Sequence, residues 1–183
     1  MQIAQNFSSR VQDKNQVLRT ENEEMIRHAK MADLPMVLEI YAHARAFMAE
    51  NGNPTQWTDR YPEESLLRSD IENRNLYVME ESGRICGVFA FIIGADETYA
   101  LIEQGGWLSD SEYGTIHRVA GDGTVHGLLQ KAVSYCEKRI SHLRIDTHRD
   151  NRIMQHVILK CGFRKCGIIY VSDGSPRIAY EKI

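Results

Sequence analysis

The second half of the sequence alternates short apolar runs with amphipathic stretches, and this alternation limits the possible folds more than any other feature. Apolar residues recur at helical spacing from Thr124 to Cys136 and again from Asn151 to Cys161. Strand-like runs surround these helices at 113–120, 143–147, 167–171 and 178–183. Strands that alternate with helices need a sheet with crossover connections, so the chain is predicted to be of the mixed α/β class.

The first half adds two helices and a hairpin to this sheet. Asp33 before Leu34-Pro35 is typical of a capped helix start, and Pro62 opens a second helix. A turn at 81–84 indicates a hairpin. The strand-like runs of this half are 25–29, 76–79 and 85–93. The predicted order is β-α-α-β-β-β-α-β-α-β-β, a mixed, mostly antiparallel sheet of about seven strands flanked by four helices.

Residues 1–24 differ from the rest because they are polar and show no amphipathic stripe. We expect a flexible extension there and a single domain at 25–183, since 183 residues fit one domain. The formal net charge of −3 provides no electrostatic footprint for nucleic acid. No apolar run reaches the roughly 18 residues that a membrane span needs, and no signal-peptide core is present.

Four cysteines have spacings that match neither a zinc ribbon nor a CxxC motif. They are Cys86, Cys136, Cys161 and Cys166. Nothing else in the sequence indicates secretion, so we expect reduced, buried or half-buried thiols and a cytoplasmic location.

The order of elements and two segments resemble the GNAT superfamily of acetyl-CoA-dependent N-acetyltransferases. The opening IRHAKMADLPMVLEIY is similar to the first strand and helix of that family. RIDTHRDNRIMQHVILKCGFRKCGIIY is similar to its fifth strand, fourth helix and following strand, and Asn151 to Gly162-Phe163 fits its N...GF spacing. The resemblance covers about residues 25–183. It implies acetyl transfer from acetyl-CoA to a primary amine of a small molecule or peptide, with a homodimer as a possible assembly.

The cofactor loop of that family usually reads Q/R-x-x-G-x-G/A after the fourth strand. The corresponding residues here are Thr124, Val125, His126, Gly127, Leu128 and Leu129, and the resemblance implies that they bind the cofactor. Only Gly127 matches the pattern, and Leu129 is bulky where Gly or Ala is usual. We expect Thr124 to cap the helix, whose first amides point outward and bind anions such as the CoA pyrophosphate. Gly127 would let the backbone approach that group closely.

Acetyl transfer to an amine needs a base for the amine proton and a hydrogen-bond donor for the thioester carbonyl. The candidate bases are His117, on the expected central strand, and Glu103, in a stretch without clear periodicity. By resemblance, amides near Arg118 and Val119 meet the carbonyl and the pantetheine arm, and Asn151 touches that arm. Structural alternatives stay open: a hydrogen-bonded histidine, a solvated carboxylate, and a helix cap for Asn151.

Many relatives carry a tyrosine on the fourth helix that protonates the leaving thiolate, and Ile158 aligns with that position. Tyr135 and Tyr170 are the remaining candidates for this acid. Asp146 and His148 end the fifth strand, where ligands of open sheets gather. Aromatic residues that could frame an amine are Trp57, Tyr61, Tyr99 and Trp107. The missing tyrosine also fits an alternative function, a catalytically weak or inactive GNAT-fold module that binds acyl-CoA or a metabolite. No metal site is expected.

Overall fold

The computed structural model describes residues 25–57 and 60–183, and within them it confirms the predicted order of elements. The predicted extension at 1–24 lies outside the described residues. The strands are β1 (Met25–His28), β2 (Leu76–Glu81), β3 (Arg84–Ile93), β4 (Gly114–Gly121), β5 (Leu143–Thr147), β6 (Arg164–Tyr170) and β7 (Pro176–Lys182). The helices are α2 (Leu34–Glu50), α3 (Glu64–Glu72), α4 (Leu128–Glu137) and α5 (Arg152–Lys160), with short 3₁₀ turns η1 (Met31–Asp33) and η2 (Glu97–Tyr99).

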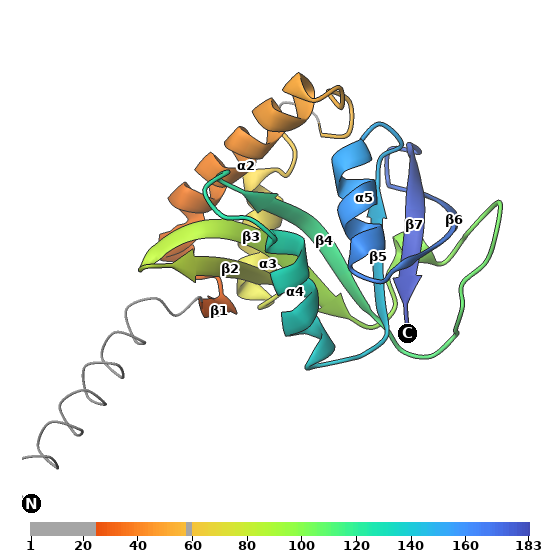
Figure 1. Cartoon of the computed structure of the whole chain (residues 1–183). Helices are drawn as coiled ribbons and strands as arrows, with labels where there is room; N and C mark the ends of the chain where they lie inside the picture. Colours follow the sequence, from red (N-terminus) through yellow and green to blue (C-terminus); the bar gives the residue numbers. More distant parts are fainter. Residues whose placement is uncertain (1–24, 58–59) are drawn as a thin grey trace, which may run out of the picture.

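The seven strands form one sheet in the order β1-β2-β3-β4-β5-β7-β6 (Figure 1). Every neighbouring pair is antiparallel except β4 and β5, which are parallel. The parallel pair arises because α4 carries the chain from the end of β4 back to the start of β5, which is the predicted crossover. The prediction of a mixed, mostly antiparallel sheet is therefore confirmed.

The helices cover the sheet on two sides. Helices α4 and α5 pack on one face, here called the α4/α5 face, while α2 and α3 pack on the other, the α2/α3 face. Helix α4 buries Leu129, Ala132, Val133 and Cys136, which recur at helical spacing. The long β3–β4 connection continues the α2/α3 face over β6 and β7, where Tyr99 packs in a small core of its own.

Strands β4 and β5 separate after a short shared register. Residues Gly114–Ile116 pair with Leu143–Ile145, and no pairing follows, so the two strands diverge from a common end (Figure 1). Ile116 and Ile145 belong to the core under α4 and α5. Because side chains alternate along a strand, His117 and Asp146, one residue further on, face the α2/α3 side.

A bulge in β4 turns its backbone at the point of separation. Val88 pairs with Ala120 and Ala90 with His117, so two residues of β4 oppose one of β3. Arg118 lies in this bulge with a positive φ of 53°. Its carbonyl accepts a hydrogen bond from the Tyr41 hydroxyl of α2, at 2.9 Å. Since a trans peptide orients its C=O and N–H in opposite directions, the Val119 N–H points away from α2.

The side chains of two predicted cap residues do not bond to their helices, because other partners compete for them. Helix α4 begins at Leu128 rather than Thr124, since the amide and hydroxyl of Thr124 both donate to Asp122 Oδ1, at 2.9 and 2.5 Å. Asp33 occupies the predicted N-cap position of α2, but its side chain makes no bond to that helix, because the carboxylate accepts from the Lys30 amide at 2.8 Å and pairs with Arg27. In both places a local turn replaces the cap that the sequence suggests.

A buried polar network holds the β3–β4 connection against β5 and β7. Glu181 is fully buried, and its carboxylate accepts from the Leu108 amide and from Arg144 Nε at 2.9 Å. His142 Nε2 lies 2.6 Å from the same carboxylate, and the Arg144 guanidinium lies 3.9 Å from the centre of the Trp107 ring. This network orders a connection that shows no periodicity in the sequence.

Candidate active site

A cavity of about 910 Å³ lies where β4 and β5 separate. Its lining comes from both faces of the sheet, because it includes His43 and Trp57 on one side and Val157 and Lys160 of α5 on the other. His117, Arg118 and Val119 of β4 and Asp146 of β5 line it as well. The cavity therefore reaches both faces through the gap between the two strands.

The α2/α3 end of the cavity contains a histidine bound to a carboxylate. His117 Nε2 lies 2.9 Å from Asp96 Oδ2. Burial opposes ionisation of Asp96, but the hydrogen bonds from His117 and Thr98 outweigh it and hold the pKa of that carboxyl below its usual range. An ionised carboxylate can only accept, so His117 Nε2 donates this hydrogen bond and Nδ1 is the ring nitrogen left for another partner. A histidine held in this way is a candidate general base.

A second carboxylate lies close to this pair. The Tyr99 ring packs edge-on to the His117 ring, 5.8 Å between centres, and the Tyr99 hydroxyl donates to Asp146 Oδ1 at 2.7 Å. Burial and the charge of Asp146 raise the pKa of Tyr99 well above its ordinary value, so the hydroxyl remains a donor. Arg177 Nε lies 4.0 Å from the other oxygen of Asp146.

The α4/α5 end of the cavity is formed by the start of α4 and one side of α5. Gly127 is the N-cap of α4 in the left-handed conformation, with φ 74°, and no side chain caps the helix. The first helical bond runs from the Lys131 amide to the Gly127 carbonyl, so the amides of the three preceding residues have no intrahelical acceptor. His126, His156 and Lys160 add exposed basic side chains to this end.

The bulky residues of the cofactor loop are accommodated by the core. Leu129 is buried under α4, while Leu128 packs against two glycines. A Cβ atom at Gly121 would lie 2.1 Å from Leu128 Cδ1, and one at Gly87 would lie 2.7 Å from Leu128 Cδ2. At Gly127, by contrast, a Cβ atom would touch only Gln130 Oε1, at 3.4 Å. The space in front of Gly127 is therefore open, as a bound pyrophosphate requires.

The structure brings most of the predicted site residues together around the cavity. The lining includes His117, Arg118, Val119, Val125, His126, Gly127, Leu128, Leu129 and Asn151. Asn151 also caps α5, because its side chain accepts from the Met154 amide at 3.1 Å and donates to Gln56 Oε1 at 2.9 Å. The cap alternative for this residue is confirmed.

Other predicted residues lie away from the cavity. Glu103 is exposed and accepts from the Tyr170 hydroxyl at 2.8 Å, and its backbone bridges to Ile168 at the edge of the sheet. Thr124 and His148 are not among the cavity-lining residues. Ile158 is fully buried in the core under α5 and does not line the cavity.

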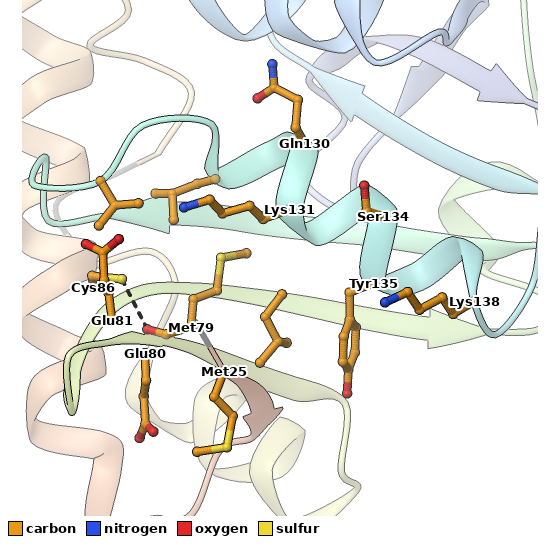
Figure 2. A pocket seen from close by; sticks show the side chains of 13 residues that line it. Met25, Met79, Glu80, Glu81, Cys86, Gln130, Lys131, Ser134, Tyr135 and Lys138 are labelled. Atoms are coloured by element: carbon orange, nitrogen blue, oxygen red, sulfur yellow. Dashed lines mark hydrogen bonds between the residues drawn. The ribbon is translucent and has the colours of Figure 1, made fainter. Parts of the chain in front are cut away.

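A second hollow, of about 540 Å³, lies between α4 and the start of the sheet (Figure 2). Met25, Met79 and Tyr135 line it, together with Lys138 at its rim. Cys86 donates a hydrogen bond to the Met79 carbonyl there, at 3.3 Å. Tyr135 thus faces this hollow rather than the larger cavity, which makes it remote from His117.

All four cysteines are buried and unpaired, as predicted. Burial raises the pKa of each thiol, that of Cys136 to about 12, so none is a ready nucleophile. Within residues 25–57 and 60–183, no three His, Cys, Asp or Glu side chains converge as a metal site would require. No helix of the same ranges is long and apolar enough to cross a lipid bilayer.

Sequence reasoning missed Asp96 as the partner of His117. Asp96 Oδ1 accepts from the Thr98 amide, and this local turn was readable from an aspartate two residues before a threonine. The pairing of Asp96 with His117 depends on how β3, the β3–β4 connection and β4 meet in the folded chain. Gln56 was missed because its hydrogen bond with Asn151 likewise joins segments that are far apart in the sequence.

The sheet separates between its fourth and fifth strands, beside the uncapped start of α4 and the His117–Asp96 pair, and this fold is shared by acetyltransferases of known structure. Its structure is similar to that of a GNAT-family acetyltransferase from Streptococcus agalactiae 2603, with 33% identity, a TM-score of 0.79, and 87% of this chain and 95% of the other covered. The protein belongs to the GNAT family of acetyltransferases. No protein-family model and no curated protein matches the sequence.

More distant structures share the fold alone. A ribosomal-protein-alanine N-acetyltransferase from Brucella melitensis is 21% identical with a TM-score of 0.58, and the alignment covers 87% of this chain and 99% of the other. The protein yncA from Salmonella typhimurium, whose structure contains its cofactor acetyl-CoA, is 17% identical with a TM-score of 0.55, over 86% of this chain and 92% of the other.

Proposed function

We propose that this acetyltransferase transfers an acetyl group from acetyl-CoA to a primary amine of a small molecule or peptide. The observation that carries the proposal is the His117–Asp96 pair, which lies on the wall of a cavity that passes through the sheet. The named activity of the Brucella melitensis protein, acylation at nitrogen, and the acetyl-CoA of the Salmonella typhimurium structure support the same chemistry on this fold.

His117 is the proposed general base. An amine must lose a proton to become a nucleophile, and the lone pair on His117 Nδ1 can accept it directly or through water. Asp96 holds the imidazole in that tautomer and stabilises the imidazolium that forms. The alternative base, Glu103, is exposed and does not line the cavity.

The α4/α5 end is the proposed binding site of acetyl-CoA, which supplies an activated acetyl group when bound. The uncapped amides at the start of α4, next to Gly127, would hold its pyrophosphate. Lys160, His126 and His156 add positive charge or hydrogen-bond donors suited to phosphate. Val125, Leu128 and Leu129 of the loop would shape this end, whereas Thr124 does not line the cavity.

The bulge in β4 provides the proposed donor for the thioester carbonyl. Arg118 commits its carbonyl to Tyr41, which directs the Val119 N–H away from α2. An amide held in this orientation stabilises negative charge on a carbonyl oxygen as the amine attacks. Asn151, across the cavity on β5–α5, would contact the pantetheine arm.

A second candidate function is a binding module that holds acyl-CoA without turnover. The buried Ile158 favours it, because no side chain at that position can protonate a leaving thiolate. Thermal-shift measurements with acetyl-CoA and assays of CoA thiol release over a panel of amines separate the two. Stabilisation together with thiol release and an acetylated product supports the enzyme. Stabilisation without product from any amine leaves the binding module, and the absence of stabilisation rejects both.

A further inference from the structure

The two ends of the cavity carry opposite charge. At the α4/α5 end, the ionisable lining residues are His126, His156 and Lys160, with no carboxylate among the described ones. At the α2/α3 end, the lining includes four carboxylates, those of Asp70, Asp96, Asp146 and Asp173, and two guanidinium groups, those of Arg118 and Arg177. Four carboxylates thus lie with two guanidinium groups at this end, and the imidazoles of His43 and His117 lie beside them.

The two arginines cannot serve as a binding site for an anionic acceptor. Arg118 forms a buried ion pair with Asp70, so its charge is matched. Arg177 donates to the Ser175 hydroxyl at 2.9 Å and to the carbonyls of Pro176 and Gln56, both at 3.2 Å. These bonds occupy most of its donors.

Asp146 retains capacity to bind a cation. A carboxylate offers about four acceptor sites on its two oxygens. Among the described residues, Asp146 receives one hydrogen bond, from the Tyr99 hydroxyl, and forms a long ion pair with Arg177 Nε, at 4.0 Å. Asp96, by contrast, is engaged with His117 at the proposed reaction centre. An ammonium group at Asp146 would thus lie beside, and not at, the base.

A buried hydroxyl in the same cavity also lacks a partner. Thr147 follows Asp146 on β5, so its side chain faces the α4/α5 side of the sheet; it is fully buried and lines the cavity. Its Oγ1 has no hydrogen-bond partner among the described residues. Buried hydroxyls are normally satisfied, so this one indicates a polar ligand in the gap. Trp57 and Tyr61, 6.0 Å apart between ring centres, add aromatic faces that suit an alkylammonium chain.

We infer that the acceptor is a dication, an aliphatic diamine or a longer polyamine, which reacts at one nitrogen while Asp146 binds the other as an ammonium group. This inference rests on the proposed amine acetylation. The reacting nitrogen loses its proton to His117 and forms the amide bond as the thioester C–S bond breaks, and CoA leaves as the thiolate or thiol. The distal nitrogen keeps its charge throughout.

Three four-carbon compounds test the inference, because they share one reactive amine and differ only in the distal group. They are 1,4-diaminobutane, 1-aminobutane and 4-aminobutanoate. We expect kcat/KM for the diamine to exceed that for 1-aminobutane by at least ~10-fold, and 4-aminobutanoate to be the poorest substrate. Asp146→Asn, which keeps the acceptor for Tyr99, should reduce the ratio of kcat/KM for the diamine to that for 1-aminobutane to within ~3-fold. Asp110→Asn, an exposed carboxylate outside the cavity, is the matched control and should keep the preference.

The outcomes separate this inference from the proposed function. A preference for the diamine that Asp146→Asn removes supports the dicationic acceptor. Equal rates for the diamine and 1-aminobutane, or a preference for 4-aminobutanoate, overturn it while acetyl transfer to amines stands. A preference unchanged in Asp146→Asn overturns the role of Asp146. If neither the diamine nor any other compound of this series or of a wider amine panel causes release of the CoA thiol, both the dicationic acceptor and the proposed amine acetylation are rejected.

Discussion

Replacing Gly127 with alanine tests the cofactor loop, because the structure separates the cost to folding from the cost to binding. Gly127 has φ 74°, and the left-handed conformation costs a residue with a Cβ atom roughly 1 kcal/mol. For a domain of this size, such a loss lowers Tm by about 2–4 °C. The added methyl group would stand in front of the uncapped amides of α4, where the pyrophosphate is proposed to bind. We therefore expect acetyl-CoA affinity to fall by at least ~10-fold, about 1.4 kcal/mol.

A matched variant removes the effect of backbone strain. Gly83, in the turn between β2 and β3, has φ 75°, and a Cβ atom there would meet nothing within 4 Å. Gly83→Ala should lower Tm as much as Gly127→Ala while leaving acetyl-CoA affinity unchanged. Titration calorimetry gives the affinities, and thermal unfolding without ligand gives the stabilities. If folded Gly127→Ala binds like the wild type, or if both variants lose affinity equally, the loop is not the cofactor site.

Four further predictions concern the base, the acid and the N-terminus. His117→Ala should lower kcat/KM at least ~10-fold. Glu103→Ala should keep kcat/KM within ~3-fold of the wild type, because the Glu103 carboxylate lies outside the cavity. Steady-state kinetics that show the reverse would make Glu103 the base. The pH profile of kcat should rise in one limb and show no fall near a tyrosine pKa, since Ile158 cannot act as an acid; a falling limb that disappears in a tyrosine variant would contradict this. Because folding lowers the pKa of Asp96 below its ordinary value of 3.8, the ionised carboxylate stabilises the folded state at pH values above 3.8. This stabilisation is lost as the pH falls through the pKa of the folded state, so the Tm difference between wild type and Asp96→Asn should shrink in acid. A chain that starts at Met25 should keep the Tm of the full protein, and a large loss would show that residues 1–24 pack on the domain.

The fold was predictable because its signals are local. A few neighbouring residues determine each of these signals, which are the helical spacing in α4 and α5, the left-handed helix end at Gly162 and the turn between β2 and β3. The errors have local causes too. Thr124 is, like Asn151, of a residue type that caps helices, but Asp122 lies two residues before it and accepts a hydrogen bond from its hydroxyl.

The candidate site was only partly predictable, because its chemistry depends on tertiary pairs. His117 could be proposed from its residue type and strand, but its partner Asp96 is 21 residues away across a connection without periodicity. Tyr99 and Asp146 are separated by 47 residues. Glu103 was as plausible as Asp96 by residue type, and only packing shows which carboxylate reaches the cavity.

The contact between Leu128 and its two glycines has a consequence for how this loop can change over evolutionary time. A Cβ atom at Gly121 would overlap Leu128, and one at Gly87 would crowd it, so alanine at either position requires Leu128 to change its rotamer or a smaller side chain at 128. Conversely, once a smaller residue replaces Leu128, larger residues can replace the two glycines. Leucine could then return at position 128 only together with the glycines. The three positions, far apart in sequence, are thus expected to be substituted as a set, and the order of the steps matters.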